Sequence, residues 1–260
     1  MRASITKKRV LITAGSTWTK IDDVRVMTNI FTGNTGIKMA KHFAEMGAET
    51  TLLYNPRINY ARRVINLSAR PYTTFDGLKK AMEEEISSGR YDIVIHSAAV
   101  SDYGHNVKQL VEVKDSGLNL APGMRLFKEV DNIPGKIKSD LPELTVTMER
   151  TEKIVDFVKK WDPDVFLVKF KLEVDRTYEE LIDIAEKSRV ASGADLIVAN
   201  DLHGSQNGIP PAIILGSDEM KIVDKRKLLA SRVFNVIDWE LKRREENECA
   251  TCRNGRNRRI

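Results

Sequence analysis

Cysteine is scarce in this sequence, and both copies lie near its end. Of the 260 residues, only Cys249 and Cys252 are cysteines, in the string ECATCRNG. A single C-x-x-C pair, without a second pair or a nearby histidine, cannot complete a tetrahedral zinc site within the chain. This pattern favours two free thiols in a loose tail, residues 246–260, over a redox or metal motif.

Long hydrophobic runs are also missing. The longest, such as VLITA and IIL, are far shorter than the roughly 18 to 20 residues of a membrane span. The N-terminal string MRASITKKRV has no apolar stretch of the kind found in a cleaved secretory signal. We therefore expect a cytoplasmic protein that does not cross a membrane.

Positive charge is in excess only at the C-terminus. The formal net charge is +5, and most of it comes from four arginines in the final segment RNGRNRRI. No aromatic residues are interleaved with them, as they would be in a groove for single-stranded nucleic acid. We expect a solvated basic tail and no nucleic-acid partner.

Strand and helix patterns alternate along most of the chain. Six or more strands alternating with helices predict an α/β fold, a Rossmann-like, mostly parallel sheet with helices on both faces. We expect a single domain, 1–260, with its core at about 9–240 and a flap or arm at 103–142, where no period is sustained. The expected strands are 9–14, 49–54, 91–100, 144–149, 165–172, 194–201 and 212–216, and the expected helices are 36–47, 73–89, 152–161, 177–193 and 225–245.

Small and polar residues follow the predicted strands, at the sheet edge where such folds bind ligands. Gly15 follows the first strand, and the string HSAAVSDY (96–103) ends the third. Ala98 and Ala99 are small enough for a ligand to approach the backbone. Asp102 is placed to accept a hydrogen bond from a ribose, a base or a metal-bound water, or equally to cap a turn.

Two further strings suit phosphate. In TNIFTGNTG (28–36), Gly33 and Gly36 stand at the mouth of a helix expected to start near Ile37, where backbone N–H groups and the helix dipole favour an anion. An ordinary glycine-rich loop ending in an N-cap fits as well. In GKIKSD (135–140), Lys136 and Lys138 either close over a triphosphate or form a solvated charge run.

A nicotinamide-dependent reductase shares the opening β-loop-α-β pattern, but three details count against it. The glycines come about twenty residues after the first strand, and the second strand ends in Tyr54-Asn55, without an acidic residue to hold a ribose. A Tyr-x-x-x-Lys pair and a Walker A sequence are also missing.

Five strings together resemble one enzyme family. LITAGSTWTKIDDVRVMTNIFTGNTG, AAVSDY, KIK, FKLEVD and ADLIVAND, in this order and at these separations, are similar to phosphopantothenate–cysteine ligase, and the similarity spans about residues 9–240. Because the chain begins at the ligase motif, we expect the monofunctional form of this family.

The resemblance implies an activity and its co-substrates. Members join 4′-phosphopantothenate to L-cysteine in coenzyme A biosynthesis, through an acyl-nucleotidylate formed from a nucleoside triphosphate. It implies CTP rather than ATP as the favoured nucleotide, Mg²⁺ as its companion, and a homodimer.

The resemblance also assigns residues. It implies that Asn29 hydrogen-bonds the acyl-nucleotidylate and that the flap residue Lys136 contacts the nucleotide. The other positions that it assigns are Asp102, Phe170 and Lys187 for the nucleotide, and Arg25, Ala98 and Ala99 for phosphopantothenate. From their places in the sequence, we add Gly15 to the nucleotide group and Gly33 to the phosphopantothenate group.

The chain departs from the family at two lysines. Members carry a pair of lysines before ADLIVAND, and here only Lys187 is present, with Ala191 and Ser192 where the second would fall. Asn34 also stands where many relatives have a lysine. The alternative is therefore a nucleotide- or flavin-binding module without ligase activity, since a fold does not fix a function.

Overall fold

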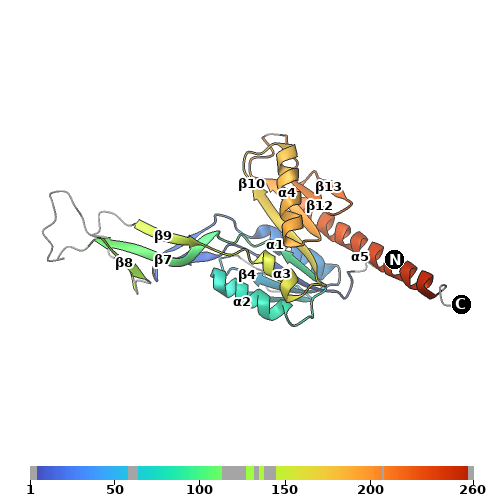
Figure 1. Ribbon diagram of the computed structural model, residues 1–260, viewed down its shortest axis with the longest axis horizontal. Helices are drawn as coiled ribbons and strands as arrows, with labels where there is room; N and C mark the ends of the chain where they lie inside the picture. The colour runs from blue at the N-terminus through green and yellow to red at the C-terminus, as the bar shows by residue number, and fades with distance from the viewer. Residues whose placement is uncertain are drawn as a thin grey trace.

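The computed structural model describes residues 5–57, 64–112, 127–131, 135–137, 145–206 and 208–256. At its centre is an eight-stranded sheet (Figure 1). Six neighbouring strands are parallel to one another, and the last two strands at one edge are joined by antiparallel pairing. The expected α/β fold with a mostly parallel sheet is confirmed. In spatial order the strands are β5 (Leu67–Pro71), β4 (Glu49–Tyr54), β1 (Arg9–Ala14), β6 (Ile93–His96), β10 (Phe166–Glu173), β11 (Leu196–Asp201), β12 (Ala212–Leu215) and β13 (Met220–Val223).

The central strands are buried on both faces. Val10, Leu11 and Ile12 of β1 are all fully buried, although successive side chains point to opposite faces. A strand covered on both sides has no reason to alternate apolar with polar residues. This explains why the strands read as continuous apolar runs in the sequence.

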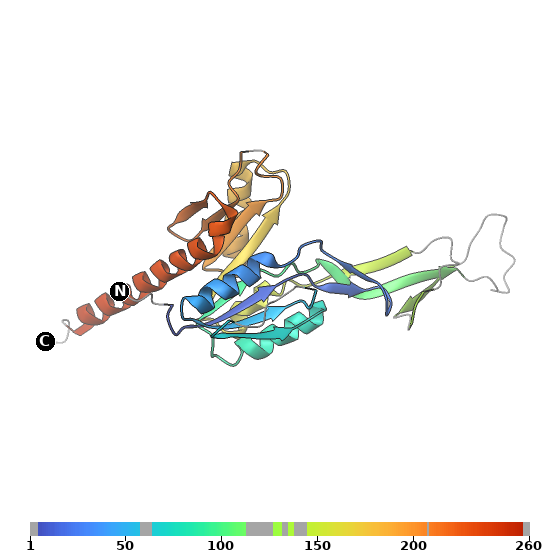
Figure 2. The ribbon, with the colours of Figure 1, turned by 180° about the vertical axis from the view of Figure 1, so that it is seen from behind.

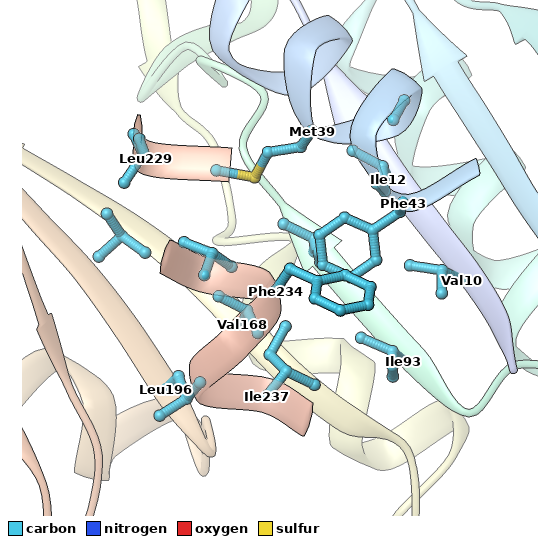
Figure 3. Close-up of a cluster of buried hydrophobic side chains, with 14 of the residues drawn as sticks. Val10, Ile12, Met39, Phe43, Ile93, Val168, Leu196, Leu229, Phe234 and Ile237 are labelled. Carbon is cyan, nitrogen blue, oxygen red and sulfur yellow. The ribbon is translucent and has the colours of Figure 1, made fainter. Parts of the chain in front are cut away.

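Two helices cover one face of the sheet, α1 (Asn34–Glu45) and α5 (Leu229–Arg256), the latter preceded by a short 3-10 turn, η1 (Arg226–Leu228). They pack against each other through Phe43 and Phe234, whose ring centroids lie 5.1 Å apart in an edge-to-face arrangement. Figure 3 shows these rings among the buried side chains of the strands, including Ile12 and Val168. Burying such large apolar groups supplies most of the driving force for docking the helices.

Three helices cover the opposite face. α2 (Phe75–Ile86) and α3 (Val155–Trp161) share one apolar cluster, and α4 (Tyr178–Ser192) packs against β11 and β12. The ends are set by local chemistry. The hydroxyl of Thr177 and the side chain of Glu180 form a capping box at the start of α4, and Gly193 ends it in the left-handed conformation.

A three-stranded antiparallel sheet forms an arm that extends away from the body (Figures 1 and 2). In it, β7 (Tyr103–Glu112) pairs with both β8 (Phe127–Asp131) and β9 (Thr145–Arg150). The strand expected at 144–149 therefore belongs to the arm and not to the parallel sheet, because its partner is β7. The rest of the expected flap or arm, residues 113–126, 132–134 and 138–142, lies outside the described residues.

One other expectation needs correction. The loose tail expected at 246–260 is helical as far as Arg256, because α5 continues through it. That stretch contains no proline, and its glutamates, alanine and arginines favour a helix. The long loop after β1 contains a hairpin of two short strands, β2 (Trp18–Lys20) and β3 (Val26–Thr28).

Helix α1 begins at Asn34, so Gly36 lies in its first turn and not in the loop before it. A Cβ at Gly36 would lie 2.6 Å from both the Cβ of Ala14 and the Oγ of Ser97, and 2.9 Å from the carbonyl oxygen of Thr13. Glycine therefore allows α1 to lie directly against the ends of β1 and β6.

We predict that Gly36→Ala lowers the free energy of unfolding by about 2 kcal/mol, because overpacking outweighs the better helix propensity of alanine. Gly77→Ala is the matched control. It makes the same exchange in the first turn of α2, where the nearest atom, Thr74 Oγ1, would be 3.3 Å away. We expect it to change stability by less than about 1 kcal/mol in urea denaturation. Equal effects of the two substitutions would contradict the close packing.

Candidate functional site

The order of the strands reverses between β1 and β6, and we call the region beyond the carboxyl ends of these two strands the β1–β6 crevice. The chain passes from β1 to β4 and β5 on one side of the sheet, and from β6 to β10 and β11 on the other. In an open parallel sheet, ligands bind beyond the carboxyl ends of the strands at such a reversal. The predicted site residues that follow β1 and β6 therefore lie where a ligand of this fold is expected.

A short backbone ladder joins the two loops at this point. Ser16 and Ala99 form an isolated parallel bridge beyond the ends of the strands. The N–H of Ala99 donates to the carbonyl of Gly15 at 2.9 Å, and the N–H of Thr17 donates to the carbonyl of Ala99 at 3.2 Å. The ladder brings together three predicted site residues, Gly15, Ala98 and Ala99.

Asn29 joins this group directly. Its side-chain Nδ2 donates to the carbonyl of Ala99 at 3.3 Å, and the side chain remains exposed. The segment that carries it is tied down on both sides, because the Thr28 hydroxyl donates to the carbonyl of Thr17 at 2.9 Å and the Ser16 hydroxyl to that of Phe31 at 3.0 Å. One hydrogen bond orients the amide, and a further N–H and the carbonyl oxygen belong to the same exposed group.

Two residues that the sequence analysis did not single out support the loop after β1. The hydroxyl of Tyr72 lies 3.0 and 2.9 Å from the carbonyl oxygens of Ala14 and Gly15, and Asn55 Nδ2 donates to the carbonyl of Ser16 at 2.7 Å. Burial raises the pKa of the Tyr72 hydroxyl, so it remains a donor. Asn55 follows β4, the neighbour of β1, and Tyr72 follows β5, the next strand beyond β4. Their position directly after a strand was the available signal.

A buried polar row crosses the three central strands just below the crevice. Thr13, His96 and Lys169 are neighbours in the register of β1, β6 and β10, and each is at least nine-tenths buried. The Thr13 hydroxyl accepts from the N–H of Ala98 at 3.1 Å and lies 3.0 Å from Nδ1 of His96. It therefore has its own hydrogen to donate to a neutral imidazole.

Burial lowers the pKa values of the two titratable side chains in this row, His96 and Lys169. Burial, together with the charge of Lys169, lowers the pKa of His96 to about 4, so the imidazole is neutral near pH 7. Burial also lowers the pKa of Lys169 to about 8. Its ammonium donates to the carbonyl of Ser188 at 3.1 Å and to the hydroxyl of Ser192 at 3.0 Å, in the last turns of α4. Both contacts join the sheet to α4.

The N-terminus of α1 lies beside the ends of β1 and β6, and its first turn has no side chain that would compete with a bound anion. Gly33 is its N-cap, in the left-handed conformation with φ of 72°, and no side chain caps the first turn or places an acidic group there. Backbone N–H groups at such an end favour an anion. This is consistent with the role expected for Gly33.

Arg25 and Lys136 are also brought together. Nη2 of Arg25 donates to the carbonyl of Ile137, the residue after Lys136, at 2.7 Å. Lys136 is exposed. The segment carrying the flap lysine therefore lies against the β2–β3 turn.

The remaining predicted residues are more scattered. Asp102 is exposed, and its carbonyl accepts from the N–H of Thr151 at 2.9 Å. Phe170 is half-buried against the α1–α5 core cluster. Lys187 pairs with Asp183 at 2.7 Å on an exposed face of α4, about 14 Å along the helix from its start at a rise of 1.5 Å per residue. Its assignment to the nucleotide stays a prediction.

Two features are absent from the described residues. No group of three or more His, Cys, Asp or Glu side chains among them could hold a metal ion. None of the helices in the described part of the chain has the length and hydrophobicity that a membrane crossing requires.

Comparisons with known proteins agree with this fold. The family model described as "DNA/pantothenate metabolism flavoprotein C-terminal domain" matches residues 5–133 and 125–227. The coenzyme A biosynthesis bifunctional protein CoaBC of Thermococcus kodakarensis is 33% identical over 239 residues, which are 90% of this chain and 52% of that protein. The chain spans about half the length of the curated relatives it matches.

Solved structures share the architecture. The DNA/pantothenate metabolism flavoprotein from Streptococcus pneumoniae has a TM-score of 0.68 at 28% identity, covering 89% of this chain and 98% of that one. A mutant of Cab2 in complex with phosphopantothenate-cysteine has a TM-score of 0.64 at 16% identity, covering 92% and 89%. At that identity the second likeness concerns the fold alone.

The buried histidine predicts a pH dependence of stability. Since the pKa of His96 is lowered from 6.5 to about 4, the unfolded chain takes up the proton first as the pH falls below about 6.5. The free energy of unfolding should therefore decrease by up to about 3 kcal/mol between about pH 7 and pH 4 through this group alone. Urea denaturation followed by circular dichroism measures it.

The variant His96→Asn should lose this part of the pH dependence. His203→Asn, at an exposed histidine, is the matched control and should retain it. An unchanged pH dependence in His96→Asn would contradict a neutral, buried imidazole.

Proposed function

We propose a reaction for this chain, which belongs to the DNA/pantothenate metabolism flavoprotein C-terminal domain family. The chain joins 4′-phosphopantothenate to L-cysteine. The reaction is a step of coenzyme A biosynthesis and consumes a nucleoside triphosphate. Support comes from a relative named for coenzyme A biosynthesis and from the first two ligase strings, which contain the bridged residues Ser16 and Ala99 at the β1–β6 crevice. The observation that carries the proposal is the contact between Asn29 and the carbonyl of Ala99.

The proposed reaction has two steps. A carboxylate oxygen of phosphopantothenate attacks the α-phosphorus of the nucleotide, and pyrophosphate leaves. The amine of cysteine then attacks the acyl carbon, the C–O bond to the nucleotidyl group breaks, and the nucleoside monophosphate leaves as the nitrogen loses a proton. A carboxylate is already a nucleophile, so the protein's task is to hold the reactants in line and to stabilise developing charge.

Asn29 suits the central position in this reaction. Its amide offers donors and an acceptor without a net charge, so it can bridge a carbonyl and a phosphoryl oxygen without electrostatic repulsion. The Ala99 carbonyl fixes one N–H and so orients the rest of the amide towards solvent. A group oriented before the substrate arrives loses little freedom in the transition state.

The other predicted site residues keep the roles expected for them. Lys136 contacts the nucleotide phosphates, and Arg25, Ala98 and Ala99 line the phosphopantothenate side. Gly33 and the N-terminus of α1 favour an anionic group of either substrate. Phe170, Gly15 and Lys187 are assigned to the nucleotide.

We extend the proposal to CTP in preference to ATP, to Mg²⁺, to a cytoplasmic location and to a homodimer. Magnesium normally reaches such sites with the nucleotide phosphates and keeps several of its waters, so it requires few protein ligands. The exposed carboxylate of Asp102 fits a contact with that water shell. When bound, the ion would neutralise phosphate charge.

The test is pyrophosphate release by the full chain with phosphopantothenate, cysteine and either CTP or ATP. We expect turnover that requires phosphopantothenate and is faster with CTP. Asn29→Ala should lower kcat about 100-fold, the effect of removing one preorganised donor. The matched control is Asn235→Ala, on an exposed position of α5, which should leave kcat unchanged.

Two outcomes would count against the proposal. Nucleotide or flavin binding without turnover would favour a binding module in place of a ligase. Turnover that is unaffected by Asn29→Ala would remove that residue from the role assigned to it.

A further inference from the structure

The carboxylate of Asp22 is completely buried in the turn between β2 and β3, with a side-chain exposure of 0%. Its Oδ1 accepts from the N–H groups of Val24 at 2.9 Å and Arg25 at 2.6 Å. Its Oδ2 accepts from Nε of Arg25 at 2.9 Å and from the N–H of Ile137 at 3.0 Å. One side chain therefore joins the turn to a segment more than one hundred residues away.

Other hydrogen bonds hold the same segment. The carbonyl of Ile137 accepts from Nη2 of Arg25 at 2.7 Å. Asp23 and Gly135 exchange two bonds, since Oδ2 of Asp23 accepts from the N–H of Gly135 at 2.8 Å and the N–H of Asp23 donates to the carbonyl of Gly135 at 3.1 Å. We call the contacts of Asp22, Asp23 and Arg25 with Gly135 and Ile137 the latch.

The latch grips both neighbours of Lys136 and leaves the lysine side chain exposed. When the backbone is fixed at the residue before and the residue after a position, the Cα at that position has little freedom to move. The region that the ammonium of Lys136 can reach therefore depends on the latch, and the latch depends most on the one carboxylate buried inside it.

The charge of Asp22 is required for these contacts. Burial opposes ionisation, but hydrogen bonds from the backbone of Ile137, Val24 and Arg25 and from the Arg25 side chain outweigh it and hold the pKa of the carboxyl far below its usual range. A carboxylate accepts at both oxygens, whereas an amide accepts at only one. Asparagine at position 22 can keep either the turn or the bond to Ile137, not both.

We propose that Asp22 is a positioning residue, which acts through the latch to place Lys136 for the reaction at the β1–β6 crevice. The inference rests on the proposed function and adds to it the residue that sets where the flap lysine lies. Asp22 itself touches no substrate.

The latch can be tested without any activity, by trypsin cleavage of the full chain after Lys136, followed by mass spectrometry. Asp22→Asn should be cleaved there about tenfold faster, which corresponds to about 1.4 kcal/mol of lost local stability. The matched control is Asp92→Asn, just before β6 at the amino-terminal ends of the strands. That carboxylate also accepts from a backbone N–H, of Arg9 at 2.8 Å, and from a cation, Lys8 at 3.3 Å. It should not change cleavage after Lys136.

A second variant covers the possibility that Asp22→Asn does not fold. Asp23 is exposed, and Asp23→Asn weakens only the bond to Gly135, so it should accelerate the cleavage by a smaller factor. Cleavage rates equal to those of the unaltered chain in both variants would overturn the latch.

The positioning role is tested by a double-mutant cycle on kcat for pyrophosphate release. Measured at saturating phosphopantothenate, Asp22→Asn should lower kcat about tenfold in the unaltered chain and by less than about twofold in the Lys136→Ala background. Any effect of Asp22 on Arg25 then changes KM for phosphopantothenate, whereas its effect on kcat acts through Lys136. An equal loss in both backgrounds would overturn the role. Absence of turnover in the unaltered chain would overturn the reaction and the role together, whereas the cleavage rates would still decide whether the latch exists.

Discussion

The backbone bridge between Ser16 and Ala99 is the contact on which the rest of the candidate site depends. The central strands β1 and β6 end at Ala14 and His96, and the two loops that follow them would otherwise be separate. The bridge extends the pairing of β1 and β6 beyond His96 and turns the two loops into one rigid rim. Asn29 then has a fixed carbonyl, that of Ala99, on which to orient its amide.

Helix α1 and the side chain of Thr13 support the residues next to the bridge. Gly36 lets α1 approach the strand ends closely, and the Thr13 hydroxyl holds the N–H of Ala98 inside the sheet. The row of Thr13, His96 and Lys169 places polar groups in the interior, and the hydrogen bonds that each side chain makes offset the cost of burying it. The structure thus combines an apolar core on both faces with a polar layer at the edge that carries the site.

The sequence alone predicted the elements whose burial leaves a pattern. Strands 9–14 and 49–54 coincide with β1 and β4. In β1, burial on both faces leaves a nearly continuous apolar run in the sequence. The grouping of Gly15, Ala98 and Ala99 followed from the rule that loops after parallel strands share one edge. The β2–β3 hairpin and the pairing of β9 with β7 could not be predicted, because three-residue strands and long-range antiparallel partners leave no periodic signal. The latch was also missed, since its partners are far apart in the chain.

The proposed function requires that the carboxylate of phosphopantothenate attack the α-phosphorus of the nucleotide, and isotope transfer tests this most directly. The substrate is labelled with ¹⁸O in its carboxylate, and the products of turnover by the full chain are analysed by mass spectrometry. The account predicts one ¹⁸O atom in the nucleoside monophosphate, because the attacking oxygen leaves with the phosphorus. Label in inorganic phosphate, or an unlabelled nucleoside monophosphate, would contradict it.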